Sequence, residues 1–312
     1  MARTHTKKQM NKDPSFRKNK PLEYFPVQRK MYLAPISGAT QTGILDAGRL
    51  LSTSNHRLYR YGKKYEMKID MDVSALNAAT DTLDVYALSD SWAVQKAYEE
   101  AKRVFDKAYI NERENLSKEA RARWFDFRAS AGVVGDEMLA VVKVDPNDPS
   151  IILSGGEFDS STVEDNAGAQ RFFSWNPTTT ASNYSIPAEY DLSGNTTRSP
   201  TTPTGSGPYA DLQADSSPLE MEALQQRGNL PPYEADAFPG VWVKVATLAT
   251  SSGSTSNGAQ RLSTGFFDAP CGLAVIKASG TTTMLNLSEK VSCEFKSGDY
   301  KGVRAHNMER LS

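Results

Sequence analysis

Histidine is scarce in this sequence, and its absence from most of the chain limits the available chemistry. His5, His56 and His306 are the three histidines, and the first and last lie near the two ends. A Ser-His-Asp or Cys-His site would therefore depend on His56, which no motif surrounds, and a hydrogen-bonded surface histidine is the simpler interpretation. The sequence also lacks HExxH, GxxxxGK[ST], GxSxG and a GxGxxG that follows a strand, so we expect no enzyme.

Cysteine is equally rare. Cys271 and Cys293 are the two cysteines, and no CxxC motif occurs. Such sparse use fits a reducing compartment and argues against a disulfide scaffold. Two interpretations stay open: the cysteines face each other on neighbouring strands, or each is a small buried hydrophobic residue.

Long apolar runs are missing as well. No run reaches the roughly 20 residues that a membrane span needs. Residues 1–30 contain no apolar segment of the kind found in a signal peptide. We therefore expect no contact with a membrane.

The net charge of −1 conceals an uneven distribution. Residues 1–64 hold 14 Lys and Arg against Asp13, Glu23 and Asp46, a balance of +11, which leaves −12 for the remainder. A basic first segment on an acidic body indicates a polyanion that is contacted by one end only.

Residues 1–30 have the character of an arm, because their cations are spread among polar residues and prolines with no helical period. Phe16, Tyr24 and Phe25 are aromatics that could stack on unpaired bases. Each cation near a phosphate releases a counterion, so binding would be blind to sequence and sensitive to salt. A solvated terminus without a partner and a nuclear-import signal are the alternatives. The candidate nucleic-acid-binding cations of the arm are Arg3, Lys7, Lys8, Lys12, Arg17, Lys18, Lys20, Arg29 and Lys30.

A second group of cations precedes the clearest predicted strand. It is the densest mixture of basic and aromatic residues in the chain, and we expect it to face nucleic acid. The alternative is an ordinary polar beginning of the strand that follows. The cations are Arg57, Arg60, Lys63 and Lys64, set among Tyr59, Tyr61 and Tyr65.

Residues 83–128 contain the main helical signal. After an alternating, strand-like opening, Asp90 and Ser91 offer N-cap chemistry. Apolar residues then recur at three- and four-residue steps on one helix face. Ser117 can cap a second helix with Ala120, Trp124 and Phe127, so the sequence predicts a helical hairpin at about 90–130. The tryptophans, Trp92 and Trp124, fit packing anchors better than a ligand cage. The apolar face consists of Val94, Ala97, Tyr98, Ala101, Val104, Phe105 and Ala108.

Strand patterns dominate elsewhere. Residues 65–73 alternate apolar and charged side chains, which is typical of an antiparallel sheet with one wet face. Further strands are predicted at residues 138–144, 151–153, 171–175, 241–246, 272–278 and 283–295. About eight strands with turn-rich joins favour a mainly β fold, a single jelly roll with a helical insert. The predicted division is a basic arm and lead-in over residues 1–64 and a shell domain over residues 65–312.

Two loops between these strands have unusual composition. Carboxylates crowd the loop that holds Glu157, Asp159, Glu164 and Asp165, which could bind Ca²⁺ between subunits. Their spacing matches no EF-hand, and a solvated loop is the alternative. Residues 176–218 are rich in Ser, Thr and Pro, which predicts a surface excursion or a linker.

The helical stretch also carries a resemblance. The residues DSW-V-KAYEEAK, followed by LSKEARARWFDFR, resemble the helical segment in capsid proteins of small circular Rep-encoding single-stranded DNA viruses of the CRESS type, including bacilladnavirus-like members. The resemblance implies one jelly roll per chain, an icosahedral shell of many copies, and a basic arm that faces the genome. It also implies a place in the virion, with assembly in the host nucleus or cytoplasm. The arm of this chain departs from that pattern, because it is shorter and favours Lys over Arg.

The sequence thus predicts a coat protein that binds its own copies and a single-stranded DNA genome, with no cofactor apart from the Ca²⁺ considered above. We expect Trp92, Phe105 and Trp124 to make apolar contacts between subunits. A carbohydrate-binding or adhesin-like sandwich without a nucleic-acid role is the alternative, supported by the Ser/Thr/Pro-rich loop and exposed aromatics. An enzyme that uses paired carboxylates on a β scaffold is a third possibility.

Overall fold

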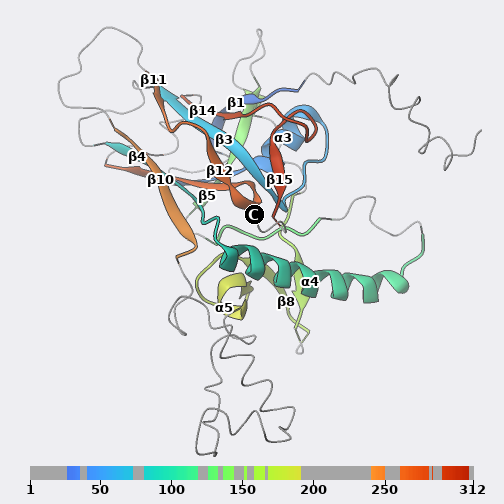
Figure 1. Cartoon of the computed structure of the whole chain (residues 1–312). Helices are drawn as coiled ribbons and strands as arrows, with labels where there is room; N and C mark the ends of the chain where they lie inside the picture. The colour runs from blue at the N-terminus through green and yellow to red at the C-terminus, as the bar shows by residue number, and fades with distance from the viewer. Residues whose placement is uncertain are drawn as a thin grey trace, which may run out of the picture.

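The computed structural model describes residues 27–35, 41–72, 81–118, 126–132, 136–143, 151–152, 158–165, 168–190, 240–249, 261–280, 283 and 290–308. This part of the chain is mainly β and sandwich-like. Figure 1 shows the strands gathered in one body, with a long helix running along one end of it.

The first layer of the sandwich is built around β3 (Lys63–Asp72). The other strands of this layer are β1 (Lys30–Pro35), β11 (Arg261–Ser263), β12 (Phe267–Ala269), β14 (Val291–Phe295) and β15 (Ala305–Asn307). β1 pairs with β14 and β14 pairs with β3, both antiparallel. The short strands β12 and β11 follow one another along the opposite edge of β3, and β15 pairs with the beginning of β3 on the same edge as β14. The order is therefore β1-β14-β3-β11, with β12 and β15 also on β3.

The second layer has the order β2-β13-β4-β10. Its strands are β2 (Thr42–Asp46), β13 (Leu273–Ser279), β4 (Thr82–Leu88) and β10 (Trp242–Ala249), all joined antiparallel. One strand links the layers: β5 (Asp136–Lys143) pairs antiparallel with β1 and parallel with β2. β6 (Ile151–Ile152) continues from β5. The two layers are thus one sheet that curls around its own interior.

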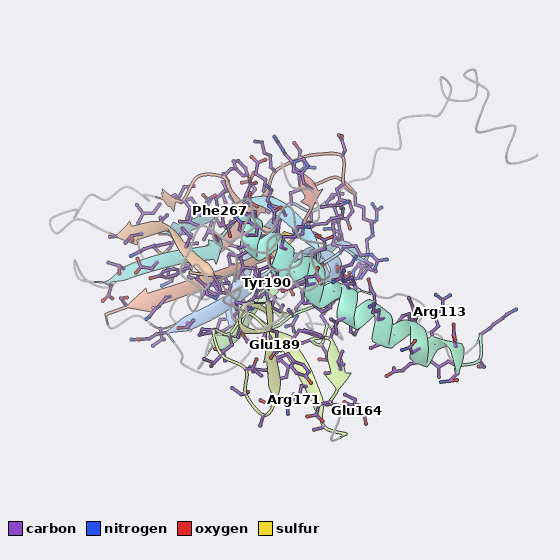
Figure 2. All side chains as sticks on the ribbon, turned by 60° about the horizontal axis from the view of Figure 1, so that its bottom comes forward. Arg113, Glu164, Arg171, Glu189, Tyr190 and Phe267 are labelled. Atoms are coloured by element: carbon purple, nitrogen blue, oxygen red, sulfur yellow. The ribbon has the colours of Figure 1, made fainter. Side chains whose placement is uncertain are left out.

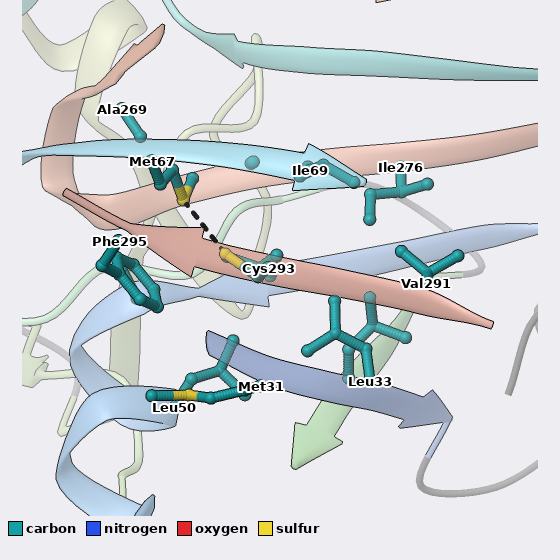
Figure 3. Packing of buried hydrophobic residues seen from close by; sticks show 14 of the residues in the cluster. Met31, Leu33, Leu50, Met67, Ile69, Ala269, Ile276, Val291, Cys293 and Phe295 are labelled. Atoms are coloured by element: carbon teal, nitrogen blue, oxygen red, sulfur yellow. Dashed lines mark hydrogen bonds between the residues drawn. The ribbon is translucent and has the colours of Figure 1, made fainter. Parts of the chain in front are cut away.

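The main core lies between these layers. Met67 and Ile69 of β3 and Cys293 of β14 share one buried cluster with Val85 of β4 and Ile276 of β13. Figure 3 shows side chains of β1, β3, β13 and β14 pointing into this interior. The Cys293 thiol lies 3.8 Å from the sulfur of Met67. Cys271 belongs to a different buried cluster, and both cysteines are free, so each behaves as a small buried hydrophobic residue.

The alternation predicted for residues 65–73 is confirmed in β3. From Tyr65 to Met71 its odd-numbered side chains, such as Met67 and Ile69, are buried, because successive residues of a strand point to opposite faces. On the other face, Lys68 forms ion pairs with Asp70 and Glu294 at 3.4 and 3.1 Å. The predicted strands near residues 138–144, 151–153, 171–175, 241–246 and 272–278 are also confirmed. Of the predicted 283–295 hairpin, β14 is the part that falls within the described residues.

The lead-in to residue 64 belongs to the same folded body. It contributes β1, β2 and the helix α3 (Ala47–Asn55) to the sandwich. Asp46 caps α3 by accepting the Arg49 N–H at 3.0 Å. His56, exposed and in the left-handed conformation, ends this helix. The division predicted at residue 64 is therefore no structural boundary, since Lys64 and Tyr65 are neighbours within β3.

The predicted first helix is confirmed as α4 (Trp92–Glu114), and Ser91 is its N-cap. The prediction of a second helix is wrong at Phe127, which is the apolar residue of that helix that the structure describes. Phe127 lies in a non-helical segment and is buried at 5.5 Å from the Tyr98 ring and 5.1 Å from the Phe173 ring. Ala120 and Trp124 lie outside the described residues. Burial of Phe127 between α4 and the strand of Phe173 decides its conformation, rather than helix periodicity.

A second, smaller core joins α4 to a three-stranded sheet. The sheet comprises β7 (Thr162–Glu164), β8 (Gln170–Ser174) and β9 (Asn183–Ser185), followed by α5 (Ile186–Tyr190). A short 3-10 turn, η3 (Pro270–Gly272), connects β12 to β13. The predicted surface loop 176–218 is wrong over residues 183–190, because Asn183, Ser185 and Ile186 are buried in β9 and α5. Residues 191–218 lie outside the described part.

Candidate nucleic-acid interface

The segment between α3 and β3 separates its aromatic residues from its cations. Tyr59 and Tyr61 are fully buried. The Tyr59 N–H donates to the Ser52 hydroxyl at 2.8 Å, and the Tyr61 hydroxyl accepts from the Trp175 indole at 3.1 Å. Burial raises the pKa of Tyr61 well above its usual value. These tyrosines are therefore anchors of the fold, and Arg60, which lies between them in the sequence, is exposed.

A cation from the far end of the chain joins this segment. Lys301 donates a hydrogen bond from its ammonium to the Leu58 carbonyl. Its ammonium lies 5.7 Å from the centroid of the Tyr59 ring and 5.6 Å from that of Tyr300. We call Arg57, Arg60, Lys63 and Lys301 the Arg60 cluster.

Tyr300 holds the Arg60 cluster together. Its hydroxyl accepts the Arg60 N–H at 3.0 Å, and its ring lies 4.1 Å from the Lys63 ammonium. The ring also packs edge-on against Tyr65 at 6.3 Å. An aromatic face next to an ammonium is attractive because the ring carries a negative quadrupole. Tyr300 therefore fixes cations that would otherwise repel each other.

Burial and mutual repulsion both affect the pKa values of the lysines in the Arg60 cluster. Burial, followed by the charges of Lys301 and Arg60, lowers the pKa of Lys63. Burial and the charges of Arg60 and Arg57 lower the pKa of Lys301 in the same way. Like charges this close disfavour the protonated form, and an added anion would relieve that cost. The cluster thus has the electrostatic character of an anion site.

One carboxylate sits at the edge of the Arg60 cluster. Asp126 lies 3.6 Å from the Arg60 guanidinium and accepts the Tyr61 N–H at 2.9 Å. Burial raises the pKa of Asp126, against the opposing effects of that hydrogen bond and of Arg60 and Arg128. The ionised carboxylate offsets one of the four positive charges.

Lys64 does not join the cluster, although the sequence groups it there. Its ammonium lies 2.8 Å from Asp90 and 3.9 Å from Asp268, on the charged face of β3. The reason is the alternation of the strand, which directs Lys63 and Lys64 to different sides. Lys30 lies on β1 opposite Glu294 of β14, and the Arg29 carbonyl accepts the Phe295 N–H. The other arm cations, from Arg3 to Lys20, lie outside the described residues.

The described chain begins beside the Arg60 cluster. A Cβ placed on Gly302, next to Lys301, would lie 2.5 Å from a methyl carbon of Val27. Gln28 is fixed by two hydrogen bonds with Asn55, of 2.8 and 3.1 Å. Val27, the first residue that the structure describes, therefore lies next to the loop that carries Lys301 of the Arg60 cluster. Sequence reasoning missed Tyr300 and Lys301, since nothing local links them to residues 57–63.

The residues predicted to contact other subunits have different surroundings. Phe105 packs inside its own chain, 5.5 Å from the Phe127 ring and 6.3 Å from the Phe173 ring. Trp92 is 40 % exposed. Farther along α4, Val104 and Ile110 are also exposed, and Figure 2 shows the helix running away from the body towards Arg113. Trp124 is outside the described residues. The exposed apolar side chains of α4 are therefore Trp92, Val104 and Ile110, whereas Phe105 packs within its own chain.

The proposed calcium ligands are not assembled in the described part of the chain. Asp165 forms an ion pair with Arg171 at 2.7 Å and accepts the Ala169 N–H, while Asp159 and Glu164 are exposed. Glu157 lies outside the described residues. Among the residues that the structure describes, no three His, Cys, Asp or Glu side chains are grouped as metal ligands.

Comparisons with protein-family models, with curated proteins and with solved structures found no match to this chain. Among the described helices, none combines the length and apolar character of a membrane span.

Proposed function

We propose that this chain is a viral coat protein that assembles into a closed shell around single-stranded DNA. The Arg60 cluster, set beside the point where the described chain begins, is the observation that carries the proposal. It places four cations next to the residues that follow a predicted basic arm. The sequence resemblance to capsid proteins of circular Rep-encoding single-stranded DNA viruses points to the same function and to icosahedral symmetry.

The strand order supports a jelly roll as the fold of the shell subunit. Taken in chain order, the sandwich strands are β1, β2, β3, β4, β10, β11 with β12, β13 and β14. If β11 and β12 are counted as one strand, these are eight strands, numbered here one to eight along the chain. The strands of one layer then have the order one, eight, three, six, and those of the other layer have the order two, seven, four, five. Such an order fits two Greek keys of antiparallel strands around one core, an architecture used by viral capsid and lectin domains.

A jelly roll by itself does not identify a function, because the same architecture serves capsids and lectins. Charge separates the two in this chain. A carbohydrate-binding sandwich has no need of four clustered cations, whereas a polyanion would be attracted by them. The proposed role of the Arg60 cluster is to neutralise phosphates near the origin of the arm.

Salt dependence of binding to a single-stranded oligonucleotide tests this role. We expect the logarithm of the affinity to fall linearly with the logarithm of salt concentration, with a slope of about −0.7 per phosphate neutralised. Replacing Arg57, Arg60, Lys63 and Lys301 by Gln should reduce the magnitude of that slope by about 3. Replacing Lys96, Lys102, Lys107 and Arg113 of α4 by Gln is the matched control. An equal reduction by both sets, or none by the first, would reject the cluster as the phosphate contact.

A further inference from the structure

An exposed phenylalanine lies on the charged outer face of the first sheet layer. Phe266 is 45 % exposed, whereas the next residue, Phe267 of β12, packs against the main core. Figure 2 marks the position of Phe267 in the body. The alternation of extended backbone explains why one ring is covered and its neighbour is not.

Two ammonium groups flank the exposed ring. Lys68 lies 5.4 Å from the Phe266 ring centroid, and Lys296 lies 5.6 Å from it. Both distances are within the range in which a cation is attracted to an aromatic face. Carboxylates hold the two lysines in place: Glu294 lies 3.1 Å from Lys68, and Glu66 pairs with Lys296. The ring and its cations are thus arranged before any ligand arrives.

The Phe266 ring also lines an open groove of about 430 Å³. Phe267, Lys296 and Arg304 form other parts of the wall. Arg304 pairs with Glu66 at 2.9 Å, so one carboxylate is shared by two cations of the groove. The volume lies in the range of small-ligand sites, which fits an aromatic base of a nucleotide.

Charge alone does not explain what this groove would bind. Lys68 is balanced by Asp70 and Glu294, and Lys64 by Asp90 and Asp268. The groove therefore offers little net attraction for phosphate. It offers instead an aromatic ring that is 45 % exposed, and any unpaired base has a π-face that can stack on such a ring.

The groove and the Arg60 cluster lie along the same strand. β3 carries Lys63 of the cluster and Lys68 beside Phe266, five residues apart, which corresponds to about 17 Å at about 3.3 Å per residue. Lys301 of the cluster and Arg304 of the groove belong to one short segment that closes on itself through the Tyr300 and Val303 backbones. Because the alternation of β3 directs Lys63 and Lys68 to different faces, a single strand would have to follow the segment from Lys301 to Arg304 to contact both surfaces.

We propose that Phe266 is a stacking platform for an unpaired base of single-stranded nucleic acid whose backbone is held by the Arg60 cluster. This inference rests on the proposed function. It adds a base-dependent contribution to binding, separate from the phosphate-dependent contribution of the cluster. Because stacking does not discriminate strongly among bases, the platform would serve a whole genome without sequence preference.

Two labelled oligonucleotides of equal length test the platform: oligo-dT, and an abasic strand with the same phosphates and no bases. Fluorescence anisotropy with the full-length protein gives the affinity for each. We expect Phe266→Ala to weaken oligo-dT binding about tenfold and to leave binding of the abasic strand unchanged. Val243→Ala, at a half-exposed site on β10, is the control and should change neither.

A conservative variant distinguishes the loss of stacking from a folding defect. Phe266→Trp should retain oligo-dT affinity, and its added fluorescence should be quenched by oligo-dT but not by the abasic strand. Equal losses on both strands, or unchanged oligo-dT affinity in Phe266→Ala, would overturn the platform while leaving the proposed function standing. A wild-type protein that binds neither strand would overturn both.

Discussion

Val27 lies directly against Gly302, the residue after Lys301 of the Arg60 cluster. The backbone of Gly302 has a φ of +91°, and an added Cβ would lie 2.5 Å from the Val27 side chain. The contact ties the first described residue to the loop that supplies a cation of the proposed interface. Sequence gives no hint of it, because the two residues are 275 positions apart.

The Gly302 contact predicts a specific loss of stability. Gly302→Ala should lower the free energy of unfolding by about 2–3 kcal/mol, since it adds both backbone strain and a clash. Gly265→Ala is a matched control: φ is +73° there, but no atom lies within 4 Å of an added Cβ. Urea titration of both variants measures the difference, and equal losses would show that Val27 is not pressed against Gly302.

The buried ion pair of Arg128 and Asp46 should be essential to the fold. Both side chains are almost fully buried, and the Arg128 guanidinium also lies 4.9 Å from the Phe158 ring. Arg128→Met leaves the Asp46 charge buried without its partner, which should lower the free energy of unfolding by about 3–5 kcal/mol. Adding Asp46→Asn should recover part of that loss, because the uncompensated charge is then gone.

An exposed ion pair is the control for that experiment. Arg103 of α4 pairs with Glu100 at the surface, so Arg103→Met should change the stability by less than about 1 kcal/mol. Denaturation of the three variants under identical conditions supplies the comparison. A loss for Arg128→Met as small as that for Arg103→Met would mean that the buried pair is not required.

Asp126 should make nucleic-acid binding depend on pH. Burial raises its pKa, so as the pH falls through this value the carboxyl becomes neutral and the Arg60 cluster gains one net positive charge. Affinity for a single strand at 0.1 M salt should then rise about fivefold. Asp126→Asn should bind with the acid-form affinity at pH 7 and lose this step. Its amide oxygen can still accept the Tyr61 N–H.

The same shift has a consequence for stability, with a definite sign. The proton binds more tightly to folded Asp126 than to the unfolded chain, so its stabilising effect is present below the unfolded pKa. The effect is lost as the pH rises through the folded pKa. Asp84→Asn, which alters a carboxylate of β4 paired with Lys244, controls for a general change of charge. If Asp84→Asn removes the pH step in binding and Asp126→Asn does not, the assignment to Asp126 is wrong.

Replacing Phe105 of α4 should affect stability, whereas replacing Trp92 should affect assembly. Phe105 packs on Phe127 and Phe173, so Phe105→Ala should destabilise the fold by about 2–4 kcal/mol. Trp92 is 40 % exposed, so Trp92→Ser should alter stability by less than about 1 kcal/mol yet reduce the assembled fraction if it lies between subunits. Thermal melts and sedimentation velocity measure the two effects. A Trp92→Ser protein that assembles as well as wild type would remove Trp92 from the interface.

Sequence reasoning succeeded where the pattern is local. The alternation of β3 and the recurring apolar face of α4, with Ser91 as its cap, each lie within a continuous stretch, and both elements are confirmed. It missed α3, whose nine residues include glycine and three consecutive small polar residues before Asn55. A helix this short depends on tertiary packing, which periodicity does not reveal.

The candidate interface could be predicted only in part. Arg57, Arg60 and Lys63 stand close together in the sequence, and their density is the signal that found them. Tyr300 and Lys301 reach the site because the chain returns along β14 and then pairs β15 with the beginning of β3. Tyr59 and Tyr61, which the sequence sets among these cations, are buried instead of facing outward, because their rings gain more free energy from burial than from exposure.

The most direct test of the coat-protein proposal is electron microscopy of the purified full-length protein mixed with circular single-stranded DNA. We expect closed shells of uniform diameter that protect the DNA from nuclease. A variant without residues 2–26, which keeps Val27 and β1, should still form shells but hold less DNA. Monodisperse particles of 34.2 kDa with unprotected DNA would contradict the proposal.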